Sequence, residues 1–530
     1  MLGPQFGCVQ NFVQSAHPSH PALPVISLRR TRDSLLLAVL LAFTAVDVLS
    51  AQGRRVDLDL ESAVRMTIDD SYRVRRLQLD VERTRSLLDV QRAGLKSRVF
   101  MNFQTPEFER ISENKWNSNL GRDEIVREHS QRWQMDFSIE QPVIVLGYPT
   151  NGYLSLNNRV YRYTQFADDE NDIRYYNRYF VRYRQPFFQP NYLKNNLEEA
   201  ELDLENSELA FQSDAVNIID DVADDYYDLF RAGYQRLIFG ELVENLERAA
   251  TTARDRATVD ADREIEVNQV QVALANARSE LQQTLSNFRM ESSQMKQRLR
   301  LPETDSLVLD LDLEVVPLSV DEARAIEYGF NLRPQLRRLD IDERRNEIWA
   351  DEARGNNGFR LNLEVTYGRE MQDPLLRQLM DDPSNSYTVG VSGYVPIWDW
   401  GARRQRVHAQ RLSLQRVRLS IEETREAIQR DVGNVVRNLE EYQQRALSMQ
   451  ANLDLARQVS AMSLARFQAG QGSMLDLVQA FERQADTAEN FLDAYLGYRQ
   501  AILDLQRITF YDFENDVPLL ERFQIGDGST

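Results

Sequence analysis

Apolar and polar positions follow one pattern twice along the chain, at an offset of 210 residues. The apolar positions that align without a gap are Ile218, Val222, Leu229 and Val243 with Ile428, Val432, Leu439 and Leu453. A repeat at a fixed offset is the signature of a duplicated structural unit. We therefore predict two copies of one strand-and-long-helix unit, over residues 52–302 and 303–515, between a leader (1–51) and a tail (516–530).

The longest uninterrupted segment, 401–466, predicts a continuous helix because it contains no Pro and only one internal Gly, Gly433. Its apolar and small residues recur at steps of about 3.5, which is typical of coiled coils; they are Ile428, Val432, Val435, Leu439, Tyr442, Ala446, Met449, Leu453 and Ala456. A glycine-rich turn then leads into a partner helix at 474–509. The first half predicts the same pair at 191–255 and 264–300, and shorter helices are expected at 57–93 and 319–354.

Apolar and polar residues alternate in 174–185, 359–367 and 387–395, and more weakly in 98–104, which predicts four strands with one apolar and one polar face. Such strands suit either the edge of a soluble sandwich or a membrane barrel with a polar lumen. Residues 106–174 are polar and turn-rich, with possible strands at 132–140 and 152–163. We expect this segment to be an insertion on the first hairpin, largely outside the cell.

Composition favours long solvated helices, since 27% of residues are charged and the mean hydropathy is −0.51. The net charge of −19 argues against nucleic acid as a partner. The single cysteine, Cys8, and four scattered histidines offer no metal site, and the acidic run at 220–225 is typical of a solvated helix face. With no phosphate-binding loop and no catalytic triad spacing, we predict no enzymatic activity, cofactor or metal.

Arginines at 29–32, an apolar run at 35–49 and a small-residue cleavage pattern at 50–52 predict a secretory signal peptide. No other segment has 18 consecutive apolar residues, so any membrane insertion must use strands. An open sheet edge is not tolerated in lipid, and four strands are too few to close a barrel. Oligomerisation would then be obligatory.

The junction Val395-Pro396-Ile397-Trp398-Asp399-Trp400-Gly401, the helical tip at 465–477 and the closing helix at 496–507 resemble the TolC family of outer-membrane efflux and secretion channels, over roughly residues 56–515. The resemblance implies a mostly α protein with β strands. Three copies would each give four strands to an outer-membrane β-barrel, continued by a coiled-coil helical barrel through the periplasm. The implied partners are two further copies, a periplasmic adaptor, an inner-membrane transporter and outer-membrane lipid.

The resemblance also implies roles for particular residues. The tip that docks an adaptor would contain Arg466, Gly470 and Gly472, with Arg256 at the matching place of the first hairpin; Gly470 has the simpler interpretation of a helix-capping glycine. The first tip has Asp260 in place of this glycine, which puts its docking role in doubt. The tunnel entrance would include Asp476, Gln479 and Glu266, although Asp476 equally suits a solvated helix face.

Arg178, Arg182 and Arg184 share one face of a predicted strand, where they are either lumen-facing charges or interfacial and extracellular ones. Two other functions stay open at this point. A periplasmic adaptor subunit also carries a long helical hairpin, but one per chain. A secreted coiled-coil structural protein would not need the alternating strands.

Overall fold

A computed structural model describes residues 54–166, 171–257, 264–378 and 383–523. The predicted leader and signal peptide (1–51) lie outside these residues. Most of the described chain, 57–301 and 307–523, forms one compact unit, and the described residues 54–56 and 302–306 belong to a second. Among the described helices, none combines the length and the apolar character that crossing a membrane requires.

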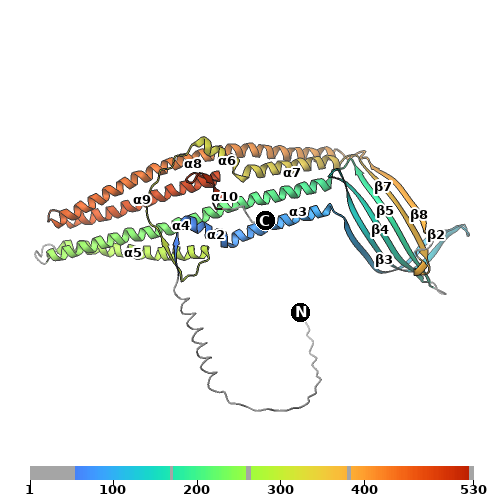
Figure 1. The fold of residues 1–530 in the computed structure, drawn as a ribbon, viewed down its shortest axis with the longest axis horizontal. Coiled ribbons are helices and arrows are strands. Elements are labelled where there is room, and N and C mark those ends of the chain that lie inside the picture. The colour runs from blue at the N-terminus through green and yellow to red at the C-terminus, as the bar shows by residue number, and fades with distance from the viewer. Residues whose placement is uncertain (1–53, 167–170, 258–263, 379–382, 524–530) are drawn as a thin grey trace, which may run out of the picture. The chain divides into compact units, whose positions relative to one another are not determined.

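Four long helices form two hairpins: α4 (Tyr192–Ala257) with α5 (Glu264–Leu299), and α8 (Ala402–Gln468) with α9 (Met474–Thr509) (Figure 1). The predicted bounds agree with these within two residues. Adding 210 to both bounds of α5 gives both bounds of α9, and adding it to the start of α4 gives the start of α8. The spacing of the elements therefore supports the duplication.

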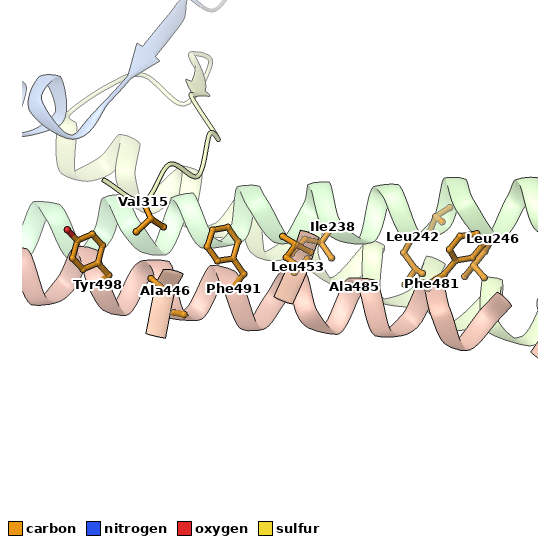
Figure 2. Packing of buried hydrophobic residues seen from close by; sticks show 14 of the residues in the cluster. Ile238, Leu242, Leu246, Val315, Ala446, Leu453, Phe481, Ala485, Phe491 and Tyr498 are labelled. Atoms are coloured by element: carbon orange, nitrogen blue, oxygen red, sulfur yellow. The ribbon is translucent and has the colours of Figure 1, made fainter. Parts of the chain in front are cut away.

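The predicted 3.5-residue seam of α8 is present, with one fully buried residue in every seven: Val432, Leu439, Ala446, Leu453, Ser460 and Phe467. The seam residues between these, such as Tyr442, which is 39% exposed, are less buried. Phe481 of α9 and Leu242 of α4 belong to the same buried cluster, which joins the two hairpins (Figure 2). One half of the seam is thus fully buried, and the other half, which includes Val435 and Met449, is partly buried against the same cluster.

The predicted helix at 57–93 is two helices, α2 (Leu60–Asp70) and α3 (Tyr72–Gly94), which follow the strand β1 (Arg55–Leu58). Ser71 separates them: its N–H donates to the carbonyl oxygen of Thr67 at 2.9 Å, and its Oγ accepts the N–H of Arg73 at 3.1 Å. Serine competes with the helical backbone in this way and favours caps over interiors. The prediction of one helix was wrong because a single capping serine does not change the periodic pattern of apolar residues from which the helix was predicted.

The predicted helix at 319–354 is also divided, into α6 (Glu322–Asn331) and α7 (Pro334–Asn356). Pro334 lies in the first turn of α7, where its missing N–H costs no hydrogen bond. Smaller elements complete the chain: β6 (Ser306–Leu309), which pairs with β1; η2 (Leu376–Gln378); β9 (Tyr511–Asp512), which pairs with β10 (Val517–Pro518); and α10 (Leu519–Arg522).

The main sheet has six antiparallel strands, not the four predicted, in the order β2-β3-β4-β5-β7-β8 (Figure 1). They are β2 (Arg98–Asn117), β3 (Arg122–Val145), β4 (Tyr148–Phe166), β5 (Asp172–Phe187), β7 (Arg360–Asp373) and β8 (Ser384–Tyr394). The possible strands at 132–140 and 152–163 are confirmed as parts of β3 and β4. The segment 106–174 therefore adds strands to the sheet and is not simply a loop.

The outer part of β2 and β3 was not predicted, because no third strand pairs with it there. The last paired residues of β3 and β4 are His129 and Phe166, whereas β2 and β3 stay paired as far as Asn117 and Arg122. Beyond His129, the side chains of this two-stranded ribbon that the structure describes are exposed or half-buried, and none is buried. Without a buried face, the period-2 alternation that reveals a strand is lost.

Candidate functional site

The six-stranded sheet has an exposed apolar face along all six strands. Its large exposed apolar residues include Val99, Met101, Phe103, Met135, Phe137, Leu154, Leu156, Val181, Tyr367, Tyr387, Val389 and Val391. Water-soluble proteins rarely expose a contiguous apolar surface of this extent. A lipid-facing wall is the arrangement in which such a face is stable.

The opposite face of the sheet is polar, and it holds the three predicted lumen arginines. Nε of Arg178 lies 2.8 Å from Oε1 of Glu370, and Nε of Arg182 lies 3.3 Å from Oε1 of Glu364. Arg184 lies 4.0 Å from the second oxygen of Glu364. Two carboxylates of β7 thus face these three arginines, and Arg182 and Arg184 share Glu364, so we expect one positive charge in excess on this part of the face.

The second helical tip ends in a left-handed glycine. Gly470 has φ +76°, and its N–H donates to the carbonyl oxygen of Phe467 at 3.0 Å, while the N–H of Gln471 donates to that of Arg466 at 2.9 Å. These two bonds define a Schellman motif. Gly472 does not share the left-handed conformation, so Gly470 alone requires glycine on backbone grounds. The side chain of Arg466 is exposed.

Arg256 of the first hairpin caps the second hairpin. Its guanidinium carbon lies 4.1 Å from the ring centroid of Phe467, whose side chain is fully buried. Its Nη2 donates to the carbonyl oxygens of Phe467 and, at 3.3 Å, of Gln468. A cation at a helix C-terminus is stabilised by the helix dipole. Arg256 therefore ties α4 to the end of α8, a role that its sequence context did not reveal.

Replacing Arg256 by Ala should loosen the second tip, because it removes both the stacking on Phe467 and the cap on α8. We expect a local cost of about 1–2 kcal/mol. The measurement is limited proteolysis at 469–473, which should become faster. Arg254→Ala on the same helical turn is the matched control, since Arg254 is exposed. Equal cleavage of the two variants would show that Arg256 does not hold this tip.

Asp476 lies in the first turn of α9 and bonds to the residue that caps this helix, Ser473. The Oγ of Ser473 accepts the N–H of Asp476 at 3.1 Å and donates to its Oδ2 at 2.7 Å, at the start of α9. Asp476 and Gln479 are exposed and line one groove of about 560 Å³ between α8 and α9, together with Met449, Asn452, Leu455, Ala456, Val459, Ser463, Ala480, Arg483, Thr487 and Asn490. The structure thus brings these two predicted entrance residues together on one surface.

The matching position of the first hairpin behaves differently. Glu266 lies in the first turn of α5 and is half-buried, and its Oε2 makes no hydrogen bond within the described part of the chain. Asp260 and Asp262, which belong to the same tip, fall outside the described residues.

The acidic run of α4 connects three other helices through ion pairs. Asp220 lies 3.4 Å from Arg507 of α9, Asp221 pairs with Arg73 of α3, and Asp225 pairs with Arg298 of α5. Among the described residues, no cluster of His, Cys, Asp and Glu is arranged to hold a metal ion. The run is therefore a point where helices are tied together by charge.

Burial raises the pKa of Asp220 to about 6; Arg507 opposes the shift and Asp224 adds to it. Because the folded pKa exceeds the unfolded one, the folded state binds more protons, and stability falls as pH rises from about 4 to about 6. Asp220→Asn lacks this titration. The free energy of unfolding of this variant, relative to that of the unmodified chain, should therefore rise between pH 4 and pH 6, by on the order of 1–2 kcal/mol after solvent screening. Thermal unfolding at four pH values tests this, and parallel curves would contradict it.

Among the acidic groups that the structure describes, Asp512 is the most enclosed, and nothing in the sequence indicated its role. Its side chain is fully buried, and its carboxylate pairs with Arg522 of α10, which also reaches Glu61 of α2 at 3.2 Å. Its remaining hydrogen bonds come from the Gln506 side chain at 3.0 Å, the Asn515 side chain at 2.8 Å and the N–H groups of Glu514 and Asn515 at 3.0 and 3.3 Å. It therefore fixes the C-terminal segment against α2 and α9.

A family model described as outer membrane efflux protein matches residues 331–509, which include all of α7, β7, β8, α8 and α9. Among curated proteins, no sequence matches the chain. The sequence-based resemblance to outer-membrane efflux channels is thereby confirmed for the second half.

Solved structures extend the likeness to most of the chain. The outer membrane protein VceC of Vibrio cholerae has a TM-score of 0.62 at 11% identity, covering 85% of this chain and 95% of that one. The CmeC outer membrane channel of Campylobacter jejuni has 0.61 at 14%, covering 88% and 90%. The MtrE outer membrane channel of Neisseria gonorrhoeae has 0.61 at 14%, covering 85% and 88%. At these identities the likeness establishes the fold.

Proposed function

We propose that this chain, whose residues 331–509 belong to the outer membrane efflux protein family, is the exit duct of a tripartite efflux or type I secretion system. It acts as a passive conduit across the periplasm and the outer membrane. The observation that carries the proposal is one sheet with an exposed apolar face and an ion-paired polar face, joined directly to two long helical hairpins. The apolar face suits lipid and the polar face suits a water-filled lumen.

The duct requires other chains. Strands β2 and β8 form the two open edges of the sheet, and open edges are not tolerated in lipid, so we infer a homotrimer whose copies complete each other. The helical hairpins would line a periplasmic tunnel and meet an adaptor and an inner-membrane transporter that supplies the energy. The matching family is one of channels, not of enzymes. Two hairpins in one chain argue against an adaptor subunit, and the exposed apolar sheet argues against a secreted structural protein.

Membrane fractionation followed by electrophoresis of unheated and heated samples tests the proposal. We expect the chain in the outer membrane, as a trimer that heating converts to monomers. A soluble periplasmic monomer would contradict it. Deleting the gene should also abolish export of the cognate solute without affecting the inner-membrane transporter's abundance.

At the mouth of the duct, Asp476→Asn should reduce cation preference, because three-fold symmetry would place three copies of this exposed carboxylate around one opening. The backbone cap from Ser473 does not depend on the charge, so the fold should survive. Single-channel recording in planar bilayers measures the effect. Asp454→Asn, an exposed acid on α8, is the control. If both variants keep the original selectivity, Asp476 serves only as the hydrogen-bond acceptor for the capping residue Ser473.

A further inference from the structure

The two edge strands of the sheet lack protection over β8 and over the first seven residues of β2, whereas the rest of β2 contains Pro106, a register shift and several charges. Soluble sheets guard their edges with charges or prolines. Strand β8 has the sequence SNSYTVGVSGY, without either, and the first seven residues of β2, RVFMNFQ, carry one charge. Apolar side chains of both strands are open to the outside: Val99 at 59%, Met101 at 56% and Phe103 at 72%, and Tyr387 at 80%, Val389 at 67% and Val391 at 63%. Such edges are built to be paired.

All six strands belong to one continuous surface. A single row of paired residues crosses the sheet without interruption: Phe100, Ser138, Asn157, Phe180, Gly368 and Ser386. The additional hairpin therefore extends the wall and does not lie over it. Because neighbours alternate in direction, β2 and β8 run in opposite senses, and the β8 of one copy placed beside the β2 of the next makes another antiparallel pair.

We propose that three copies of this chain close an eighteen-stranded barrel, three times six strands, with β8 of each copy paired to β2 of the next. The inference rests on the trimeric duct proposed above and concerns the width of its outer-membrane part. Barrel diameter grows roughly linearly with strand number, and barrels of 16–18 strands leave an aqueous channel. The lumen would be about one and a half times as wide as that of three four-stranded copies.

The lining suits bulky hydrated solutes. Opposite charges face each other along the polar face, with Arg159 and Asp136 separated by 2.6 Å and Arg98 and Glu140 by 2.9 Å. Arg132 and Arg360 on the same face make no ion pair among the described residues, and Arg182 and Arg184 share Glu364, so we expect this wall to carry a modest excess of positive charge.

Disulfide cross-linking in intact membranes tests the closure, in a Cys8→Ser background that removes the chain's one native cysteine. Val389→Cys on β8 is combined in turn with Val99→Cys, Met101→Cys and Phe103→Cys on β2. We expect covalent dimers and trimers from at least one pair. The control pairs combine Val389→Cys on β8 with Leu154→Cys or Leu156→Cys on β4. These pairs would cross-link only if β8 of one copy met β4 of the next, in a twelve-stranded barrel that leaves out β2 and β3.

Counting strands by electron microscopy of the trimer in lipid nanodiscs decides the same question directly. Eighteen strands support the inference, and twelve overturn it. Two different results contradict the two proposals. A soluble monomer would refute the duct itself, whereas an outer-membrane trimer joined through β4 and β8 would refute only the eighteen-stranded barrel.

A second surface carries an independent inference. A groove of about 590 Å³ at the start of α8 is lined by Arg354, Arg403, Arg404, Gln405, Val407, His408 and Arg411. Arg354 pairs with Asp351 at 3.0 Å, whereas Arg403, Arg404 and Arg411 form no ion pair with a carboxylate of the described chain. No acidic residue occurs between Gly401 and Ile421. In a chain with a net charge of −19, this groove concentrates positive charge, and two acids contact its lining: Asp351, paired with Arg354, and Asp399, which accepts the N–H of Arg403.

The link between β8 and α8, which leads into this groove, exposes three large apolar side chains and one acid, Asp399, whose carboxylate accepts the N–H groups of Gly401 and Arg403 at 3.0 and 2.7 Å. Ile397, Trp398 and Trp400 are 91%, 74% and 89% exposed, and the two indole rings lie 5.5 Å apart. Tryptophan favours the membrane interface, and adjacent arginines attract anionic headgroups there. We infer that the groove binds the phosphate of an anionic phospholipid whose leaflet the two tryptophans enter, given the outer-membrane location proposed above.

Native mass spectrometry of the purified trimer with added phosphatidylglycerol tests this inference. Arg404→Gln combined with Arg411→Gln should lose most of the bound lipid, and Arg416→Gln, an exposed arginine of α8 outside the groove, should retain it. Equal retention by both, or displacement of lipid by millimolar inorganic phosphate alone, would overturn the lipid site. The trimer visible in the same spectra keeps this result separate from the proposed duct.

Discussion

Replacing Gly470 by Asp should nearly abolish export while the trimer remains in the outer membrane. The residue has φ +76°, which side chains rarely adopt, so the substitution strains the turn by about 1 kcal/mol. It also places a negative charge at the C-terminus of α8, where the helix dipole disfavours anions. The measurement is export by cells that carry the variant, alongside the amount of heat-modifiable trimer.

Gly472→Asp is the matched control, because Gly472 lies two residues on but outside the left-handed region. A β-carbon there would meet the backbone nitrogen of Phe467 at 3.4 Å, an ordinary contact. We expect this variant to export better than Gly470→Asp, and Asp260→Ala in the first tip to be mild. The reverse order of severity would refute a special role for the second tip.

Asp512→Ala should cost about 3–5 kcal/mol of folding free energy, because it leaves the guanidinium of Arg522 without its buried partner. Five hydrogen-bond donors converge on this fully buried carboxylate, from Gln506, Glu514, Asn515 and Arg522. The thermal midpoint of the purified protein should fall sharply, and the yield of trimer with it.

Asp516→Ala provides the comparison for Asp512. Asp516 belongs to the same C-terminal segment and pairs with Arg324 at 3.1 Å, but its side chain is 70% exposed. Exposed ion pairs contribute only about 0–1 kcal/mol. Similar losses of stability in the two variants would show that burial of Asp512 does not decide its contribution.

The long helices could be predicted closely from sequence because their period is maintained over many turns. From Val432 to Phe467, the buried face of α8 repeats every seven residues, and such a face is visible without knowing its partner. Strands β7 and β8 were equally visible, since one of their faces is apolar and the other polar. The ribbon of β2 and β3 beyond His129 could not be predicted, because none of its described side chains is buried.

Contacts between distant residues could not be predicted. Arg256 and Phe467 are 211 positions apart, and Arg522 and Glu61 are 461 apart. Nothing in the local sequence of Arg256 distinguishes a helix cap from a docking residue. Asp476 is the intermediate case: the Ser473-Met-Leu-Asp476 spacing of a capping box can be read from the sequence, but whether the same carboxylate also lines a tunnel depends on the other copies.

We propose above that this chain forms a conducting duct through the outer membrane. The most direct measurement is single-channel recording of the purified trimer reconstituted in a planar lipid bilayer. We expect discrete, long-lived conductance steps, and we expect their ion selectivity to shift towards anions in Asp476→Asn. A trimer that inserts into the bilayer but carries no current under any applied voltage would contradict it.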